Sequence, residues 1–259
     1  MNFREYLIHH KQVVDVEVEG WFYPIDIVIL YGLLSEIQKN LKGDVCEIGV
    51  AYGKSAITVS NFKQPEDNLY LYDLFLEDIK NKAYANIKKF GKDENIIWRI
   101  QDTTDLRFED LDFENELKFL HIDGCHEHFA VLNDLTLFSG KMHEMGVIVV
   151  DDFSDYEYPG VNSAVCEFTL SKHNYNNWKV FAIGHNKAFL CQQKHHRFYQ
   201  EHLLMFMENS KVELNVPEEI EVGYGVRQLY DTNVLLFNSR LKWSIREAYR
   251  NLFNKPKVV

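Results

Sequence analysis

Two short acidic segments contain the side chains best suited to perform chemistry. Asp123 lies in the run His-Ile-Asp-Gly-Cys-His, and Asp151 and Asp152 follow the apolar run Gly-Val-Ile-Val-Val. Three carboxylates held close together repel one another and raise one another's pKa values unless a cation lies among them. An all-carboxylate site favours a hard divalent ion, with Mg²⁺ first and Mn²⁺ or Ca²⁺ behind it. The sequence therefore indicates a divalent metal site, provided that the fold brings the two segments together.

Strand geometry limits how these acidic residues act together. Consecutive residues of a straight strand face opposite sides, so Asp151 and Asp152 bind one ion only where the chain turns. The alternative is that one of them binds the ion or a substrate while the other caps the following loop. His121, His126 and His128 also cluster here, which makes zinc a second alternative. The sequence has no second His/Cys group at zinc-finger spacing, so a structural zinc site is not expected.

A glycine-containing segment and a later aspartate form a second candidate site. The run from Glu47 to Ser55, Glu-Ile-Gly-Val-Ala-Tyr-Gly-Lys-Ser, places two glycines four residues apart between a predicted strand and a predicted helix. Such glycines let the backbone turn tightly and approach a ligand, although a simple turn has the same pattern. The run is neither the G-x-G-x-x-G fingerprint nor a P-loop. Asp73, 26 residues after Glu47, is placed to accept hydrogen bonds from a ribose hydroxyl pair.

The third predicted strand ends in Gln101-Asp102-Thr103-Thr104. Two roles for Asp102 are equally supported by this run. Asp102 could accept a hydrogen bond from an adenine amino group. Equally, Asp102 or Thr103 could cap a short helix.

Alternating strand-like and helix-like runs position these groups. Short apolar strands are predicted at residues 44–50, 68–75, 95–101, 117–123 and 146–153. Helices are predicted at residues 25–42, 54–62, 76–91, 126–138 and 160–173. This alternation is typical of a parallel sheet covered on both faces, in which ligands bind beyond the carboxyl ends of the strands.

The last two predicted strands, residues 178–184 and 187–193, are separated only by His185 and Asn186, so they must form an antiparallel hairpin. We therefore predict an α/β fold with a doubly wound, seven-stranded, mostly parallel sheet and an antiparallel last strand. Residues 1–193 would form this domain with a helical lead-in. Residues 194–259 would form a C-terminal extension packed on the core, with a helix-like run at 196–208 and a strand-like run at 231–238.

Composition excludes several classes of protein. The chain has 259 residues and a formal net charge of −11, which argues against a nucleic-acid partner, since such proteins normally show a basic face. No apolar run approaches the roughly 18 residues that span a bilayer, and the polar N-terminus lacks an apolar signal core. The four cysteines are far apart and indicate reduced thiols. A cytoplasmic protein without a membrane partner is expected.

The order strand, Glu-x-Gly-x-x-x-Gly, helix, strand, Asp, with the closing hairpin, resembles the class I S-adenosylmethionine-dependent methyltransferases over roughly residues 20 to 193. The resemblance implies that Gly49 and Gly53 border the methionine part of the cofactor, Asp73 its ribose hydroxyls and Asp102 its adenine. The Gly-Trp pair that ends in Trp21 also resembles the family. The full set of expected cofactor-binding residues is Glu47, Gly49, Tyr52, Gly53, Ser55, Asp73, Asp102 and Thr103.

The segment His-Ile-Asp-Gly-x-His, with Val-Val-Asp-Asp and Pro-Gly-Val downstream, resembles the metal-dependent sugar O-methyltransferases such as those for macrocin and mycinamicin. The resemblance implies that the metal ligands are Asp123, Asp151 and Asp152, and that His126 is the general base. A metal lowers the pKa of a sugar hydroxyl, and a neutral imidazole then removes the proton. We expect a helix N-terminus and the cation to depress the pKa of His126. Cys125 departs from the acidic or polar residue that the family often carries there.

The resulting hypothesis is an S-adenosylmethionine-dependent, Mg²⁺-assisted (or Mn²⁺-assisted) O-methyltransferase that acts on a sugar or a glycosylated small molecule. One alternative is a catechol-type small-molecule O-methyltransferase. Another is a catalytically silent module that binds the cofactor or assists assembly. The aromatic run at residues 198–206 indicates either a homo-oligomer interface or ordinary core at helical spacing.

Overall fold

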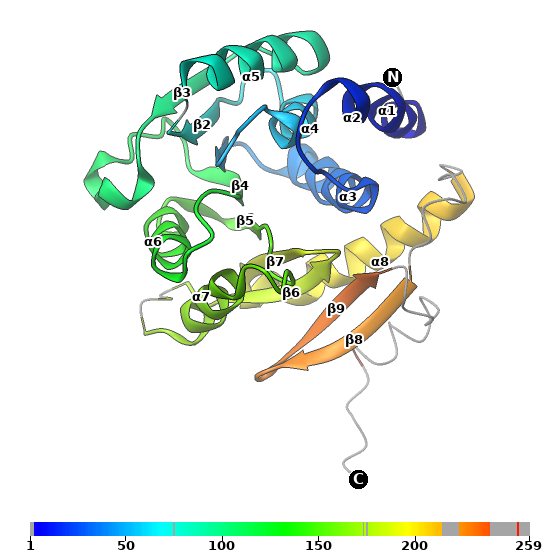
Figure 1. The fold of residues 1–259 in the computed structure, drawn as a ribbon. Helices are drawn as coiled ribbons and strands as arrows, with labels where there is room; N and C mark the ends of the chain where they lie inside the picture. Colours follow the sequence, from blue (N-terminus) through cyan, green and yellow to red (C-terminus); the bar gives the residue numbers. More distant parts are fainter. Residues whose placement is uncertain are drawn as a thin grey trace.

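The computed structural model describes residues 3–74, 76–172, 174, 176–213, 223–238 and 253, and its strands form one mixed sheet (Figure 1). The strands are β1 (Asp44–Ile48), β2 (Leu69–Asp73), β3 (Ile96–Ile100), β4 (Leu117–Ile122), β5 (Met142–Val150), β6 (Trp178–Gly184), β7 (Lys187–Gln192), β8 (Gly223–Leu229) and β9 (Thr232–Asn238). Within the described chain their order is β3-β2-β1-β4-β5-β7-β6-β9-β8. Strands β1 to β5 are parallel, and β7 is antiparallel to both neighbours. The predicted mostly parallel sheet with its β6–β7 hairpin is confirmed, and the described sheet has nine strands where seven were predicted.

Helices cover both faces of the sheet. They are α1 (Phe3–His9), α2 (Asp15–Glu17), α3 (Pro24–Asn40), α4 (Lys54–Phe62), α5 (Glu77–Phe90), α6 (His128–Ser139), α7 (Pro159–Leu170) and α8 (His196–Glu213), and a π-helical turn at His10–Val14 joins α1 to α2. Helices α1, α3, α4, α5 and α8 pack on one face, and α6 and α7 pack on the other (Figure 1). Proline fits the first turn of α3 because that turn needs no amide donor there.

The core consists of two apolar layers, one on each face of the sheet. Successive strand residues alternate between them: Val45 contributes to the layer under α3 and α4, whereas Cys46 contributes to the layer under α6 and α7. The parallel register repeats this alternation across the sheet, because Val45 lies opposite Leu69 and Cys46 opposite Tyr70. All residues of β1 and β4 are buried, as expected for central strands of a parallel sheet.

The C-terminal segment adds two strands to the sheet. The helix-like run at 196–208 lies in α8, and the strand-like run at 231–238 corresponds to β9, which pairs in parallel with β6. Strand β8, which was not predicted, pairs with β9 in an antiparallel hairpin. The buried side chain of Gln200 on α8 donates to the carbonyl oxygens of Phe181 and Asn233, both at 2.8 Å, and so ties the helix to both strands. Residues 214–222, 239–252 and 254–259 of the predicted extension lie outside the described residues.

The predicted element boundaries agree with the structure to within a few residues. Helix α4 has the predicted limits, whereas α6 begins two residues later than predicted. Phe75 and His173, at the ends of a predicted strand and a predicted helix, lie outside the described residues. None of the described helices combines the length and the apolar character that a membrane-spanning helix requires.

A buried ion pair at the amino-terminal edge of the sheet provides a test of the fold. Lys118 Nζ donates to Asp67 Oδ2 at 2.6 Å, and both side chains are buried. Lys118→Met leaves the Asp67 carboxylate buried without its cation, which should cost about 3–5 kcal/mol of unfolding free energy in urea denaturation. Arg107→Ala removes an exposed ion pair with Asp110 and should change it by less than about 1 kcal/mol. Equal effects of the two substitutions would contradict this assignment.

Candidate functional site

The loop between β1 and α4 lies directly against the loop that follows β4. Gly49 has φ = +81°, and a Cβ at this position would stand 1.9 Å from the carbonyl oxygen of Asp123. Only glycine fits such a close backbone approach. The backbone N–H of Asp123 also donates to the carbonyl oxygen of Ile48 at 2.8 Å. Gly49 therefore brings the predicted cofactor loop into contact with the predicted metal segment.

Asp73, at the end of β2, fixes the same loop. Its Oδ2 accepts hydrogen bonds from the backbone N–H groups of Val50 at 2.7 Å and of Ala51 at 2.9 Å. Bonds from amides to a charged acceptor are stronger than bonds between neutral groups. Gly53 has φ = +82°, and the carbonyl oxygen of Tyr52 accepts from Asn86 Nδ2 at 2.9 Å. The contact of Asp73 with a ribose stays a prediction.

Glu47 and Ser55 contact each other beneath this loop. The fully buried Glu47 carboxylate accepts a hydrogen bond from Ser55 Oγ, and its Oε1 lies 3.1 Å from Nδ1 of His121. Burial alone would lower the pKa of His121, but the hydrogen bond and charge of Glu47 outweigh burial and raise it. Within the described residues, Glu47 Oε2 has no hydrogen-bond donor. His121 is itself buried, so its ring belongs to the interior of the protein.

Asp102 caps a short turn. Its Oδ1 accepts from the backbone N–H of Thr104 at 2.9 Å and from Thr104 Oγ1 at 2.6 Å. These hydrogen bonds hold the pKa of Asp102 below its usual value. Thr103 is buried in the same turn, and its carbonyl oxygen accepts from Asn133 Nδ2 at 3.0 Å. The structure contains the capping interaction, and an adenine contact of Asp102 or Thr103 stays a prediction.

The ends of β4 and β5 bring two of the three predicted metal ligands together around His126. The two strands are neighbours, with Ile122 opposite Val150, which meets the condition that the fold brings the two acidic segments together. His126 Nε2 lies 3.1 Å from Asp152 Oδ2 and 3.7 Å from Asp123 Oδ1. The candidate ligand atoms of these three residues all lie within 4.8 Å of one another, which is close enough to share one ion.

Asp151 points the other way, into the protein. Its Oδ2 accepts a hydrogen bond from Nζ of Lys187, and its Oδ1 accepts from the backbone N–H of Asp152 at 2.8 Å. The Asp151 side chain is 7% exposed, whereas that of Asp123 is 30% exposed. Burial would raise the pKa of Asp151, but the charge of Lys187 outweighs burial and lowers it to about 2. Burial and the Asp151 charge together raise the pKa of Asp123 to about 6.

The backbone at Asp152 explains the opposite orientations. Asp152 has φ = +54°, so the chain leaves the strand conformation directly after Asp151. Aspartate and asparagine adopt this left-handed conformation more readily than most residues. The turn points the Asp152 carboxylate toward His126 while Asp151 stays with Lys187, so the two aspartates do not face the same side.

In the chain without a bound ion, the surroundings of His126 raise its pKa, and the lowered pKa expected beside a cation stays a prediction. Helix α6 begins at His128, so His126 lies before its first turn. The carboxylates of Asp123 and Asp152 raise the pKa of His126 to about 10. Its ring packs on that of Tyr158, with centroids 4.1 Å apart. His128 lies apart from this group and pairs with Glu167 at the surface, with Nε2 and Oε2 2.9 Å apart.

The turn between β6 and β7 supplies site residues that sequence reasoning treated only as a hairpin connection. Asn186 Nδ2 donates to Asp152 Oδ1 at 2.8 Å. The neighbouring ring of His185 packs against that of Tyr23, with centroids 3.7 Å apart and the ring planes tilted by 41°. The signal was topological: β6 is antiparallel to β7 and therefore runs in the direction of β5, so its turn emerges at the same edge as Asp152.

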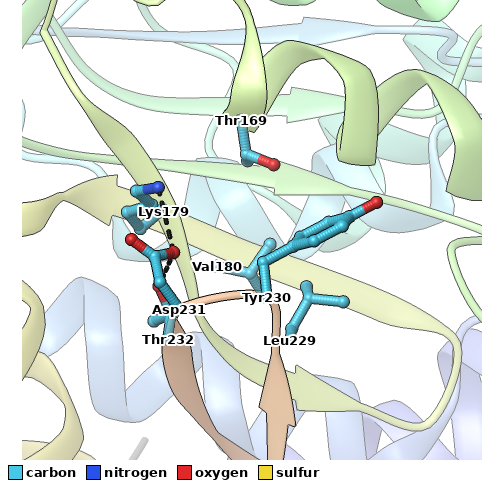
Figure 2. Close-up of a pocket in the computed structure, with 7 residues that line it drawn as sticks. All are labelled: Thr169, Lys179, Val180, Leu229, Tyr230, Asp231 and Thr232. Atoms are coloured by element: carbon cyan, nitrogen blue, oxygen red, sulfur yellow. Dashed lines mark hydrogen bonds and ion pairs between the residues drawn. The ribbon is translucent and has the colours of Figure 1, made fainter.

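A small pocket elsewhere on the molecule does not belong to this site. It lies between the start of β6, the end of α7 and the β8–β9 turn (Figure 2). Figure 2 shows Lys179 pointing toward Asp231, and the two side chains form an ion pair of 3.3 Å. Because Lys179 is near the start of β6, the pocket lies at the edge of the sheet opposite to Asp152.

Comparisons with known proteins show what the middle part of the chain resembles. Residues 46–153 match the family model described as a methyltransferase domain. An uncharacterized protein of Acanthamoeba polyphaga mimivirus is 33% identical over 112 residues, which are 41% of this chain and 45% of the viral protein. The match therefore spans less than half of that relative.

Two solved structures show the same fold. CalS11, a TDP-rhamnose 3′-O-methyltransferase of calicheamicin biosynthesis, is 11% identical with a TM-score of 0.52, over 74% of this chain and 93% of that chain. The MycE methyltransferase of the mycinamycin pathway, in complex with Mg, SAH and mycinamycin VI, is 15% identical with a TM-score of 0.51, over 74% of this chain and 54% of that chain. Residues 46–153 are thus similar to a methyltransferase domain, and the sheet that contains them shares the fold of these two solved methyltransferases.

The surroundings of His126 predict a pH-dependent contribution to stability in protein freed of divalent ions. The pKa of His126 is about 10 in the folded chain, above the value of about 6.5 for an unfolded histidine. The charged ring therefore stabilises the fold fully below pH ~6.5, and this contribution disappears as the pH rises through about 10. In urea denaturation, the difference between the wild type and His126→Gln should shrink over this interval.

Two measurements check this expectation. An NMR titration of the His126 ring should show a midpoint near 10, and a midpoint near ~6.5 would contradict the assignment. His128→Gln removes an exposed pair and should change the unfolding free energy by less than about 1 kcal/mol at every pH.

Proposed function

We propose that this chain is an S-adenosylmethionine-dependent O-methyltransferase that acts on a hydroxyl group of a sugar or glycosylated small molecule. One observation carries the proposal. The glycine loop after β1 is in backbone contact with Asp123. The carboxylates of Asp123 and Asp152 both lie close to His126. The loop suited to binding a cofactor therefore lies next to the three side chains suited to deprotonating a hydroxyl group, Asp123, His126 and Asp152. Their convergence favours turnover over a catalytically silent module.

The cofactor would occupy the ends of β1, β2 and β3. The residues proposed to line it are Glu47, Gly49, Tyr52, Gly53, Ser55, Asp73, Asp102 and Thr103. Glu47 Oε2 supports this placement, because it is a buried acceptor without a donor among the described residues. Buried acceptors normally have a partner, and the ammonium group of the cofactor would be a suitable donor. The cofactor supplies a methyl group bound to a sulfonium. When the methyl group is transferred, the sulfur leaves it as a neutral thioether.

Mg²⁺ or Mn²⁺ would be held by Asp123 and Asp152. Oxygen ligands are what such hard ions prefer, and the spacing of these groups fits a shared ion. The ion would lower the pKa of the acceptor hydroxyl. The third expected ligand, Asp151, has Lys187 as its partner, so we include only Asp123 and Asp152 in the proposed metal site.

His126 is the proposed general base. Its Nε2 would receive the hydroxyl proton as the acceptor oxygen forms its bond to the methyl carbon and the carbon–sulfur bond breaks. The carboxylates that raise the pKa of His126 are the proposed metal ligands. Sharing their charge with an ion would lower that pKa toward neutrality, which a base needs.

Aromatic side chains flank the proposed acceptor position. Tyr158 packs on His126. The tilted ring pair of Tyr23 and His185 lies beside Asn186, which donates a hydrogen bond to Asp152. Flat rings beside polar groups suit a sugar or another ring-shaped acceptor. A catechol-type acceptor is the alternative. A cytoplasmic location, a homo-oligomer and the lack of nucleic-acid or membrane partners remain predictions from composition.

The cofactor proposal predicts micromolar binding of S-adenosylmethionine or its demethylated product in calorimetry, and no measurable binding of NAD. Asp73→Ala removes the acceptor that fixes Val50 and Ala51, and should weaken binding by roughly 1.5–3 kcal/mol. Asp93→Ala changes an exposed carboxylate at the opposite edge of the sheet and should leave the affinity unchanged. Unchanged affinity in well-folded Asp73→Ala protein would remove Asp73 from the site.

The base proposal predicts that His126→Ala lowers turnover about 10²–10⁴-fold, the usual range for a lost general base. Cofactor binding should persist, because the ring is not needed for it. An excess of chelator should abolish methyl transfer and also spare cofactor binding. His128→Ala is the matched control and should retain turnover. Full activity in chelator would refute the metal, and a large defect in His128→Ala instead would show that the base is misassigned.

A further inference from the structure

Lys187 places a buried positive charge beside the proposed metal site. It is the first residue of β7, and its Nζ hydrogen-bonds to Asp151 Oδ2 and lies 3.7 Å from Asp26 Oδ2. The exposed fractions are 1% for Lys187, 0% for Asp26 and 6% for Asp151. Removing such groups from water costs several kcal/mol per ion unless they are paired. The ammonium group is therefore a required part of this interior.

Asp151 has donors on both of its carboxylate oxygens. Lys187 donates to Oδ2, and the backbone N–H of Asp152 donates to Oδ1. Asp151 is nevertheless close enough to compete for an ion, because its candidate ligand oxygen lies within 4.8 Å of that of Asp123. Binding an ion there would bring a divalent charge toward the Lys187 ammonium group, which like-charge repulsion opposes.

Asp152 differs from Asp151 in its solvent exposure and in the charge of its neighbours. Its carboxylate faces the solvent-accessible side with Asp123, and its side chain is 16% exposed. Its neighbours are the ring of His126 and the neutral amide of Asn186. No lysine or arginine in the described chain forms an ion pair with Asp123 or Asp152.

We infer that Lys187 is the permanent counter-cation of Asp151, so that the divalent ion is bound by the carboxylates of Asp123 and Asp152 without Asp151. This inference rests on the proposed function and deepens it, because it states which carboxylates serve the ion. It also departs from the three-carboxylate site that the family resemblance implies. The two consecutive aspartates then have separate roles, one inside the protein and one at the site.

Mn²⁺ titration of the full chain tests the inference. The informative variant is Asp151→Asn/Lys187→Met, which removes one negative and one positive charge and so leaves the net charge unchanged. Replacing a buried ion pair is often close to neutral, so we expect Mn²⁺ affinity within about threefold of the wild type by calorimetry and by electron paramagnetic resonance of free Mn²⁺. Asp152→Asn should weaken binding by more than about tenfold, because affinity follows the number of charged ligands.

The outcomes separate the two proposals. Loss of Mn²⁺ binding in Asp151→Asn/Lys187→Met to the extent seen in Asp152→Asn would overturn the inference and leave the proposed function standing. A wild type that binds no Mn²⁺ would instead refute the metal part of the proposed function. Circular dichroism melting establishes that each variant is folded. If the double variant is not, adding Asp26→Asn removes the other carboxylate near Lys187, and the same affinity comparison applies.

Discussion

A row of buried polar side chains, joined by hydrogen bonds and ion pairs, connects the elements that form the site. In spatial order its members are Ser55, Glu47, His121, Asp151, Lys187 and Asp26. They come from α4, β1, β4, the end of β5, β7 and α3. Acidic and basic groups alternate along the row from Glu47 to Asp26, so each desolvated charge has a partner of opposite sign. Displacement of one strand end would leave a buried charge unpaired, which holds these ends in a common arrangement.

The proposed chemistry depends on this row without being part of it. Asp151 belongs to the row, and the next residue, Asp152, turns out of the strand toward His126. Likewise, Glu47 lies beneath the loop in which Gly49 touches Asp123. Side chains that face the interior therefore fix the backbone from which the candidate catalytic groups project. This is a positional form of preorganisation, in which packing and buried pairing hold the reactive side chains before a substrate binds.

Much of the fold was predictable because near-continuous apolar strands alternate with amphipathic helices. The alternation alone does not order the strands, and it is the structure that places the ends of β4 and β5 side by side, which brings Asp123 close to Asp152. The conformation of Asp152 was not predictable, because a left-handed residue leaves little trace in a single sequence. The raised pKa of His126 in the chain without an ion was not predictable, because it depends on how closely the Asp123 and Asp152 carboxylates approach the ring. Lys187 was missed because nothing local in an apolar strand reveals its partners.

The left-handed conformation of Asp152 also bears on how such a protein can change during evolution. Asparagine adopts this conformation as readily as aspartate, and a single nucleotide change converts one codon into the other. The backbone turn, the Lys187 pair and the packed sheet would all survive that change, while the proposed metal site would lose a charge. A single substitution at Asp152 would therefore remove the proposed activity while the fold of this chain is kept. A descendant could keep the folded domain and the cofactor loop while its chemistry is lost.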